Sequence, residues 1–141
     1  MTEQELKDYL INFVQEFATK RNTYEKYVHE QDETNHKIDW FDEFRKLLEP
    51  LYDTYVTDKK RAYGGAKECS FGSPPKFDGI ENPVETSVEL KNKNRAEVYF
   101  KTESMFKDEY LFVVLQKANE WKIDSYKNRT LGREKWNNAI L

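Results

Sequence analysis

The chain has 141 residues and a mass of 16.9 kDa, which is the size of one ordinary domain with a single hydrophobic core. Aromatic residues make up 15% of the sequence, too large a share for a disordered chain, and 23 basic against 26 acidic residues give a formal net charge of −3. Neither half of the chain has the strong basic excess that phosphate neutralisation requires, so the composition excludes nucleic acid as an expected ligand.

The first predicted element is an amphipathic helix. Thr2 and Glu5 have the spacing of a capping box, in which each side chain satisfies an amide at the helix start. Apolar residues then recur every three or four positions over 6–28, and Arg21 falls largely outside this stripe. The charged and amide-rich segment 29–37 breaks the pattern, and we expect it to be a solvated loop.

A second amphipathic helix is predicted after Asp39, which is a suitable N-cap. Its apolar stripe covers 40–56 and is interrupted by Pro50. Because a proline inside a helix costs roughly 3 kcal/mol, the segment either kinks there or divides into two short helices that share one apolar face. The basic residues 59–61 suit the negative end of a helix dipole, so the predicted helices occupy about 3–60.

The pattern changes from helical to extended in the second half of the chain. Segment 64–82 contains "CSFGSPPKFDG", whose prolines and glycines predict an irregular but ordered loop. Alternating apolar and polar residues at 84–90 and 96–102 predict half-buried strands. A strand at 109–117 has no polar face, and the alternation returns at 121–126.

Helices followed by hairpin-linked strands are typical of an α+β domain, in which the helices pack on one face of an antiparallel sheet. We therefore predict a single domain over 1–141, with strands at about 84–127 and a short tail at 128–141 that docks a turn through Trp136. The apolar segment 110–115 needs cover on both faces. The helices cover one face, and sheet curvature or a dimer partner must cover the other.

The order of the elements and the closing stretch "NEWKIDSY" at 119–126 resemble the nuclear transport factor 2-like fold, a cone-shaped α+β domain. The stretch "FGSPPKFDGIENPVE" at 71–85 is similar to the immunity-protein branch of this fold, found beside toxins of bacterial polymorphic and contact-delivered systems. The resemblance spans about 6–126. It implies an immunity protein that binds and neutralises a cognate toxin domain by direct protein–protein interaction, without catalysis and without a cofactor.

An enzymatic or ligand-binding use of the cone pocket is the alternative, because the same fold hosts isomerases and dehydratases that need a buried carboxylate or histidine base. His29 and His36 lie in the polar segment after the first predicted helix, where we expect them to be solvated. Glu97 and Asp124 lie on predicted strands, but opposite the apolar phase. They reach a pocket only if the concave face of the sheet is the polar one.

Neither a metal nor a cofactor is expected. The two histidines and Cys69 match no zinc spacing, and the acidic cluster at 30–33 lacks the glycine and the terminal glutamate of a calcium loop. The stretch "YGGAK" at 63–67 lacks the spacing and the hydroxyl residue of a phosphate-binding loop.

The expected location is the reducing cytoplasm. Cys69 has no cysteine partner, no apolar run reaches about 18 residues, and "MTEQELKDYL" lacks both the basic start and the apolar core of a signal peptide. We expect no membrane partner. We also expect a monomer rather than a homodimer before the toxin binds, since an immunity protein must leave a face free.

The expected toxin-binding surface combines the Pro-Gly loop with the polar face of the sheet. Aromatic side chains are common interface anchors, Pro74 and Pro75 stiffen the loop, and the strand glutamates add acidity toward a basic, nuclease-like toxin. The candidate residues are Tyr63, Phe71, Lys76, Phe77, Asp78, Glu85, Glu89, Glu97, Tyr99 and Tyr126. Within this set, we expect alanine at Phe71 or Phe77 to weaken toxin binding with little change in melting temperature.

Overall fold

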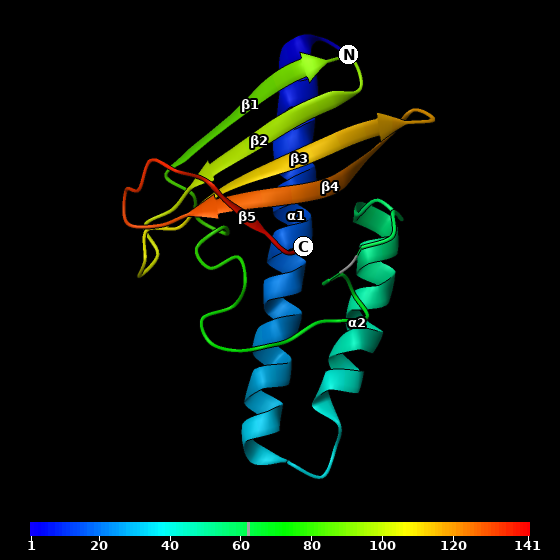
Figure 1. Cartoon of the computed structure of the whole chain (residues 1–141), viewed down its shortest axis with the longest axis vertical. Helices are drawn as coiled ribbons and strands as arrows, with labels where there is room; N and C mark the ends of the chain where they lie inside the picture. The colour runs from blue at the N-terminus through cyan, green and yellow to red at the C-terminus, as the bar shows by residue number, and fades with distance from the viewer. Residues whose placement is uncertain (62) are drawn as a thin grey trace.

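The computed structural model describes residues 1–61 and 63–141, and it consists of two helices followed by an antiparallel sheet (Figure 1). The elements are α1 (Glu3–Thr34), α2 (Trp40–Tyr55), β1 (Glu85–Asn92), β2 (Arg95–Lys101), β3 (Glu109–Lys117), β4 (Glu120–Arg129) and β5 (Asn137–Ala139). The five strands pair in sequence order. This arrangement confirms the α+β prediction. None of the described helices is both long and apolar enough to cross a membrane.

Helix α1 is longer than predicted. Its capping box is present, because the Thr2 hydroxyl accepts from the Glu5 amide at 3.1 Å and the Glu5 carboxylate accepts from the Thr2 amide at 3.3 Å. The prediction of a loop over 29–37 is wrong for its first six residues, which continue the helix to Thr34. Residues such as Glu and Gln are good helix formers in water. The helix therefore continues beyond the apolar stripe, although its side chains there are no longer buried.

Helix α2 does not divide at Pro50. Asp39 caps it as predicted by accepting from the Asp42 amide at 3.1 Å, and the helix runs without interruption to Tyr55. Pro50 is on the exposed side, where its carbonyl accepts from the Thr54 hydroxyl at 3.0 Å. The buried face of α2 packs against α1, and this packing offsets the missing proline amide.

The inner face of the sheet is apolar and lies on α1. Phe100, Phe112 and Ile123 are completely buried there, together with Phe77 and Ile80 from the Pro-Gly loop. Figure 1 shows the sheet crossing the N-terminal half of α1, while the C-terminal half of α1 lies beside α2 and the loop. The core therefore fills the concave side of the sheet.

The outer face of β3 is covered by its neighbouring strands. Val113 is only 3% exposed, and its cross-strand neighbours are Glu97 on β2 and Ser125 on β4. Long side chains on flanking strands can shield an apolar residue with their stems. This accounts for the strand with no polar face without a second layer over the sheet.

The tail forms a strand and not a turn. Residues Asn137–Ala139 pair with β4 as β5, so the sheet extends beyond the predicted strand limit of about 127. Trp136 docks on the outer face, with its ring centroid 4.1 Å from the Arg129 guanidinium and 6.1 Å from the ring of Tyr99. The helices end at Tyr55, a few residues before the predicted limit.

Candidate functional site

Two buried polar residues of α1 fix the course of the Pro-Gly loop. Asn22 holds the backbone of Phe77 on both sides, since its amide nitrogen donates to the Phe77 carbonyl at 2.8 Å and its oxygen accepts from the Phe77 amide at 3.0 Å. Glu25 accepts from the amides of Gly72 at 3.0 Å and Lys76 at 2.9 Å. Breaking such buried bonds is unfavourable, so α1 determines where the loop lies.

Glu25 also forms a buried ion pair with Arg21. The two side chains meet at 2.7 Å and are 5% and 4% exposed, and the Arg21 Nε donates to the hydroxyl of Tyr52 at 3.1 Å. The guanidinium lies 5.2 Å from the ring centroid of Phe44 and 6.0 Å from that of Phe77. Arg21 thus links α1, α2 and the loop, and the prediction that it lies outside the buried stripe is wrong.

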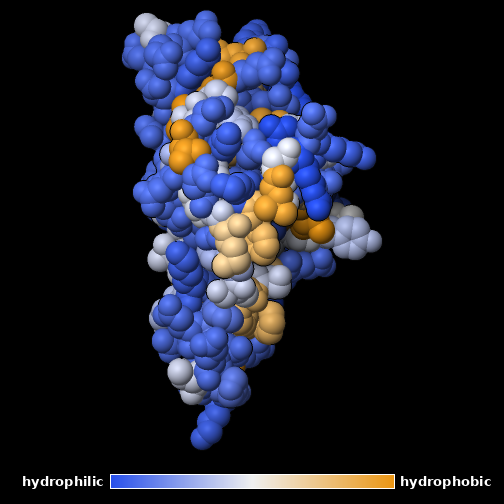
Figure 2. Space-filling model, turned by 90° about the vertical axis from the view of Figure 1, so that its left-hand side faces the viewer, coloured by the Kyte–Doolittle hydropathy of each residue, from blue (hydrophilic) through white to orange (hydrophobic). Residues whose placement is uncertain are grey.

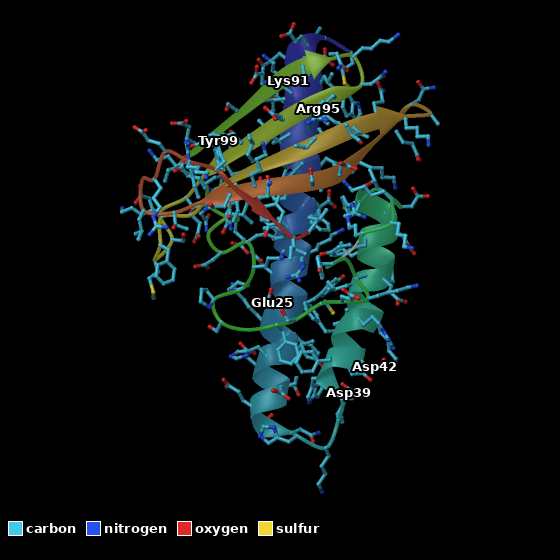
Figure 3. All side chains as sticks on the ribbon, viewed as in Figure 1. Glu25, Asp39, Asp42, Lys91, Arg95 and Tyr99 are labelled. Carbon is cyan, nitrogen blue, oxygen red and sulfur yellow. The ribbon has the colours of Figure 1, made fainter. Side chains whose placement is uncertain are left out.

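A cleft of about 600 Å³, which we call the loop cleft, opens beside this ion pair. Arg21 and Glu25 line it from α1, and loop residues such as Cys69, Phe71 and Lys76 form its walls. The C-terminal residues close one side, where the Leu141 carbonyl accepts from the Gly65 amide at 2.8 Å. Figure 3 shows Glu25 in the C-terminal half of α1, next to the loop.

Exposed hydrophobic side chains form the rim of the loop cleft. Tyr63 is 72% exposed, Ile140 is 53% exposed, and both line the cleft. Phe41 of α2 is 56% exposed and packs on half-buried Phe71, with the ring centroids 4.6 Å apart. On the face in Figure 2, hydrophobic atoms gather in a band down the middle of the molecule, surrounded by hydrophilic surface.

Burial changes the ionisation of three groups in and beside the loop cleft. Burial lowers the pKa of Lys76 to about 8, and the nearby Arg21 guanidinium acts in the same direction. Burial raises the pKa of the Cys69 thiol, which keeps the thiol protonated and unreactive at neutral pH. Burial also raises the pKa of the Asp78 carboxyl, together with the charges of Asp108 and Glu81.

The structure separates the predicted toxin-binding residues into three groups. Tyr63, Phe71 and Lys76 line the loop cleft, and half-buried Asp78 follows them in the loop. A second group shares the outer face of the sheet: Glu85, Glu89, Glu97 and Tyr99. Figure 3 places Tyr99 on the sheet, away from Glu25.

The third group is buried in the core. Phe77 is 0% exposed, and Tyr126 is 5% exposed on the inner face of the sheet, where the two rings pack with centroids 5.1 Å apart. Neither side chain can contact a partner in this conformation. This burial contradicts the expectation for Phe77→Ala. Removing a core phenylalanine leaves a cavity, so the substitution should lower the melting temperature.

A hydrogen-bonded cluster stabilises the end of the outer sheet face. The Glu109 carboxylate accepts from the Tyr99 hydroxyl and from the Arg129 guanidinium, the latter at 3.0 Å. Burial and the Glu109 carboxylate raise the pKa of Tyr99 to about 12. Tyr99 is therefore held in place by this cluster and is not a free surface side chain.

The candidate bases of the enzymatic alternative do not face a common pocket. Glu97 lies on the outer sheet face near Lys91, at 3.4 Å, and Asp124 binds the hydroxyl of Thr57 at 3.0 Å and the ammonium of Lys59 at 2.8 Å. His29 lies in α1 and not in a loop, where it contacts Glu33 at 3.2 Å. Within residues 1–61 and 63–141, no group of metal-ligand side chains is arranged to hold an ion.

Arg21, Asn22 and Glu25 organise the loop cleft, and none of them was among the residues predicted for the site. A signal for them exists, because Arg21 and Glu25 continue the buried positions Val14 and Phe17 at helical spacing. Opposite charges four residues apart inside an apolar stripe indicate a buried ion pair.

The sequence model of the NTF2 fold immunity protein family matches residues 5–139, nearly the whole chain. The chain belongs to this family. A curated relative is the immunity protein RhsIA of Dickeya dadantii (strain 3937), which is 26% identical over 95 residues that cover 67% of this chain and 68% of that protein. No solved structure matches the chain. The family assignment confirms the predicted fold and the predicted role: the protein is an immunity protein that neutralises a cognate toxin.

Proposed function

We propose that this immunity protein binds its toxin domain directly through the rim of the loop cleft. The observation that carries the proposal is the exposure of Tyr63, which lines the cleft, and of Phe41 of α2, which packs on Phe71 of a loop that α1 fixes in place. Aromatic anchors contribute much of the affinity of protein interfaces, and a preformed surface loses little entropy on binding. The rim combines both properties.

In this proposal the protein neutralises the toxin by binding to it and not by catalysing a reaction. Glu25, the most buried carboxylate of the loop cleft, accepts three hydrogen bonds and is unavailable as a base. The Cys69 thiol is protonated, because burial raises its pKa, and a thiol is a weak nucleophile. The free protein is a cytoplasmic monomer, since the rim must be open when the toxin enters the cell.

The test measures the affinity of rim variants for the cognate toxin domain by isothermal titration calorimetry. We expect Tyr63→Ala and Phe41→Ala each to weaken binding by about 1 to 3 kcal/mol, which is roughly 5- to 150-fold. Met105, which is 80% exposed and does not line the cleft, supplies the matched control. Met105→Ala should bind as the wild type does.

A result that contradicts the rim proposal would come from the outer face of the sheet. Glu89 is exposed there, and its replacement by lysine reverses one charge without opening the core. If Glu89→Lys weakens binding while Tyr63→Ala and Phe41→Ala do not, the toxin docks on the sheet and the rim proposal is wrong.

A further inference from the structure

The loop cleft contains positively charged donors that have no acceptor. Arg21 is 3% exposed and lines the cleft, and its Nε and Nη1 donate to Tyr52 and Glu25, but no described residue accepts from its Nη2. The ammonium of Lys76 lines the same cleft. In the described part of the chain it has neither a hydrogen bond nor a salt bridge.

The nearby carboxylates do not supply the missing acceptor. Glu25 Oε1 accepts from Arg21 and from the Lys76 amide, and Oε2 accepts from the Gly72 amide. This carboxylate offsets one of the two positive charges. Glu68 lines the cleft but is exposed, and in the described part of the chain it makes no salt bridge with Arg21 or Lys76. Lys76 is half-buried, and in the described part of the chain its ammonium has no salt-bridge partner, although Leu141 of the tail lines the same cleft.

We propose that the floor of the loop cleft is a binding site for a singly charged oxyanion, held between the guanidinium of Arg21 and the ammonium of Lys76. A guanidinium presents a planar fork of donors that matches carboxylate and phosphate oxygens, and hydrogen bonds between charged groups are stronger than those between neutral groups. A volume of about 600 Å³ accommodates a small molecule as well as the acidic side chain of a partner. Both carry the same oxyanion chemistry.

The two cations are positioned before any ligand arrives. The Lys76 amide is bonded to Glu25, and the next residue, Phe77, is bonded through both its amide and its carbonyl to Asn22. The Lys76 ammonium lies 5.4 Å from the ring centroid of Tyr126, which holds the aliphatic stem against the core. An anion therefore meets a preformed pair of charges, and little ordering is required on binding.

The site should depend on pH through Lys76. The titratable and charged groups that surround it are Arg21 and Glu25 on α1, Tyr52 on α2, Glu68 and Cys69 on the loop, Tyr126 on β4, and Leu141 of the tail. Burial raises the pKa of Cys69 and of Tyr126, so these two groups stay neutral while Lys76 loses its proton near pH 8. Oxyanion affinity is then complete below about pH 8 and falls as the pH rises through that value.

The test is a titration of ¹⁵N-labelled free protein with sodium acetate, with sodium chloride at equal ionic strength as the reference and inorganic phosphate in a second series. We expect saturable shifts of the Gly72 and Lys76 amides and of the Arg21 Nε–H with acetate or phosphate. Lys76→Met should reduce the affinity at least tenfold and keep the fold, because it removes a charge without removing the stem. The exposed neighbour Lys67 supplies the control, since Lys67→Met should bind as the wild type does.

Two outcomes overturn the inference. Either the shifts with acetate and phosphate equal those with chloride, or Lys76→Met binds the anions as tightly as the wild type. If saturating acetate also weakens toxin binding, and does so only while Lys76 is present, the natural oxyanion is carried by the toxin. If toxin binding is unaffected, the site is for a free small molecule. The titration uses the free protein, so it does not depend on where the toxin docks.

Discussion

Arg21 and Glu25 in the loop cleft and Lys91 and Glu89 on the outer sheet face form ion pairs of similar length, 2.7 and 3.0 Å. The first two side chains are 4% and 5% exposed, whereas those of Lys91 and Glu89 are 38% and 69% exposed. An exposed pair contributes about 0 to 1 kcal/mol, because water screens both charges. A buried pair is different, because removing one partner leaves the other charge without compensation.

The comparison shows that burial, and not the distance between the charges, decides what an ion pair does in this protein. Glu25 is bonded to two loop amides as well as to Arg21, so it determines the shape of the loop cleft. Glu89 contacts Lys91 two residues away on the same strand, and within the described residues its side chain has no hydrogen bond or salt bridge to another element. One glutamate is part of the framework, and the other is available to a partner.

The largest expected effect comes from removing the buried glutamate, and the same substitution in the exposed pair is its control. Glu25→Ala leaves Arg21 buried without a counter-charge and frees two loop amides, so we expect it to lower the free energy of unfolding by about 3 to 5 kcal/mol. Glu89→Ala should change it by less than about 0.5 kcal/mol. Urea denaturation followed by circular dichroism measures both. Equal effects of the two substitutions would contradict the distinction between the pairs.

A smaller effect is expected from the cluster on the outer sheet face. Tyr99→Phe removes the hydroxyl that donates to Glu109 and leaves Arg129 on that carboxylate, so we expect a loss of about 1 kcal/mol in the free energy of unfolding. Tyr63→Phe is the matched control, since Tyr63 is 72% exposed and its substitution should change nothing measurable. A loss of more than about 3 kcal/mol for Tyr99→Phe would show that this face is as tightly coupled to the fold as the loop cleft.

The third expected effect is a pH dependence of stability that Lys76 adds. Burial lowers its folded-state pKa to about 8, below the unfolded value of about 10.4, so the unfolded chain binds the proton more tightly. The charged form therefore destabilises the fold below pH 8, and this penalty is relieved as the pH rises from about 8 to about 10.4. Lys76→Met should be more stable than the wild type at pH 7. The difference should shrink over that range when both are unfolded in urea, and a constant difference would contradict the assignment.

Local features of the sequence predicted the elements well. The capping box at Thr2 and Glu5 and the N-cap at Asp39 depend on side chains that bond to amides three residues away, so they can be recognised without the fold. The alternation at 96–102 likewise predicted which side chains of β2 are buried, because a strand has only two faces. The family resemblance was also carried by short stretches of sequence, and the family assignment confirmed it.

Periodicity predicted less about where α1 ends. The apolar stripe stops at Val28, the last buried residue of α1, yet the helix continues to Thr34 on residues that favour helix in water. The pattern of apolar residues reports burial, and burial and helix formation separate wherever an element projects from the core.

Only the tertiary structure decided the candidate site. Arg21, Asn22 and Glu25 are ordinary surface residue types. Asn22 and Glu25 are buried because the backbone of a loop about 50 residues away, at Gly72, Lys76 and Phe77, satisfies them, and Arg21 is buried because it donates to Glu25 and to the hydroxyl of Tyr52. Phe77 is a core residue for the same reason, although its flanking prolines and glycine indicate a surface loop. Such pairings are non-local: their energies depend on which groups meet and exclude water, and neither propensity nor spacing along the chain contains that information.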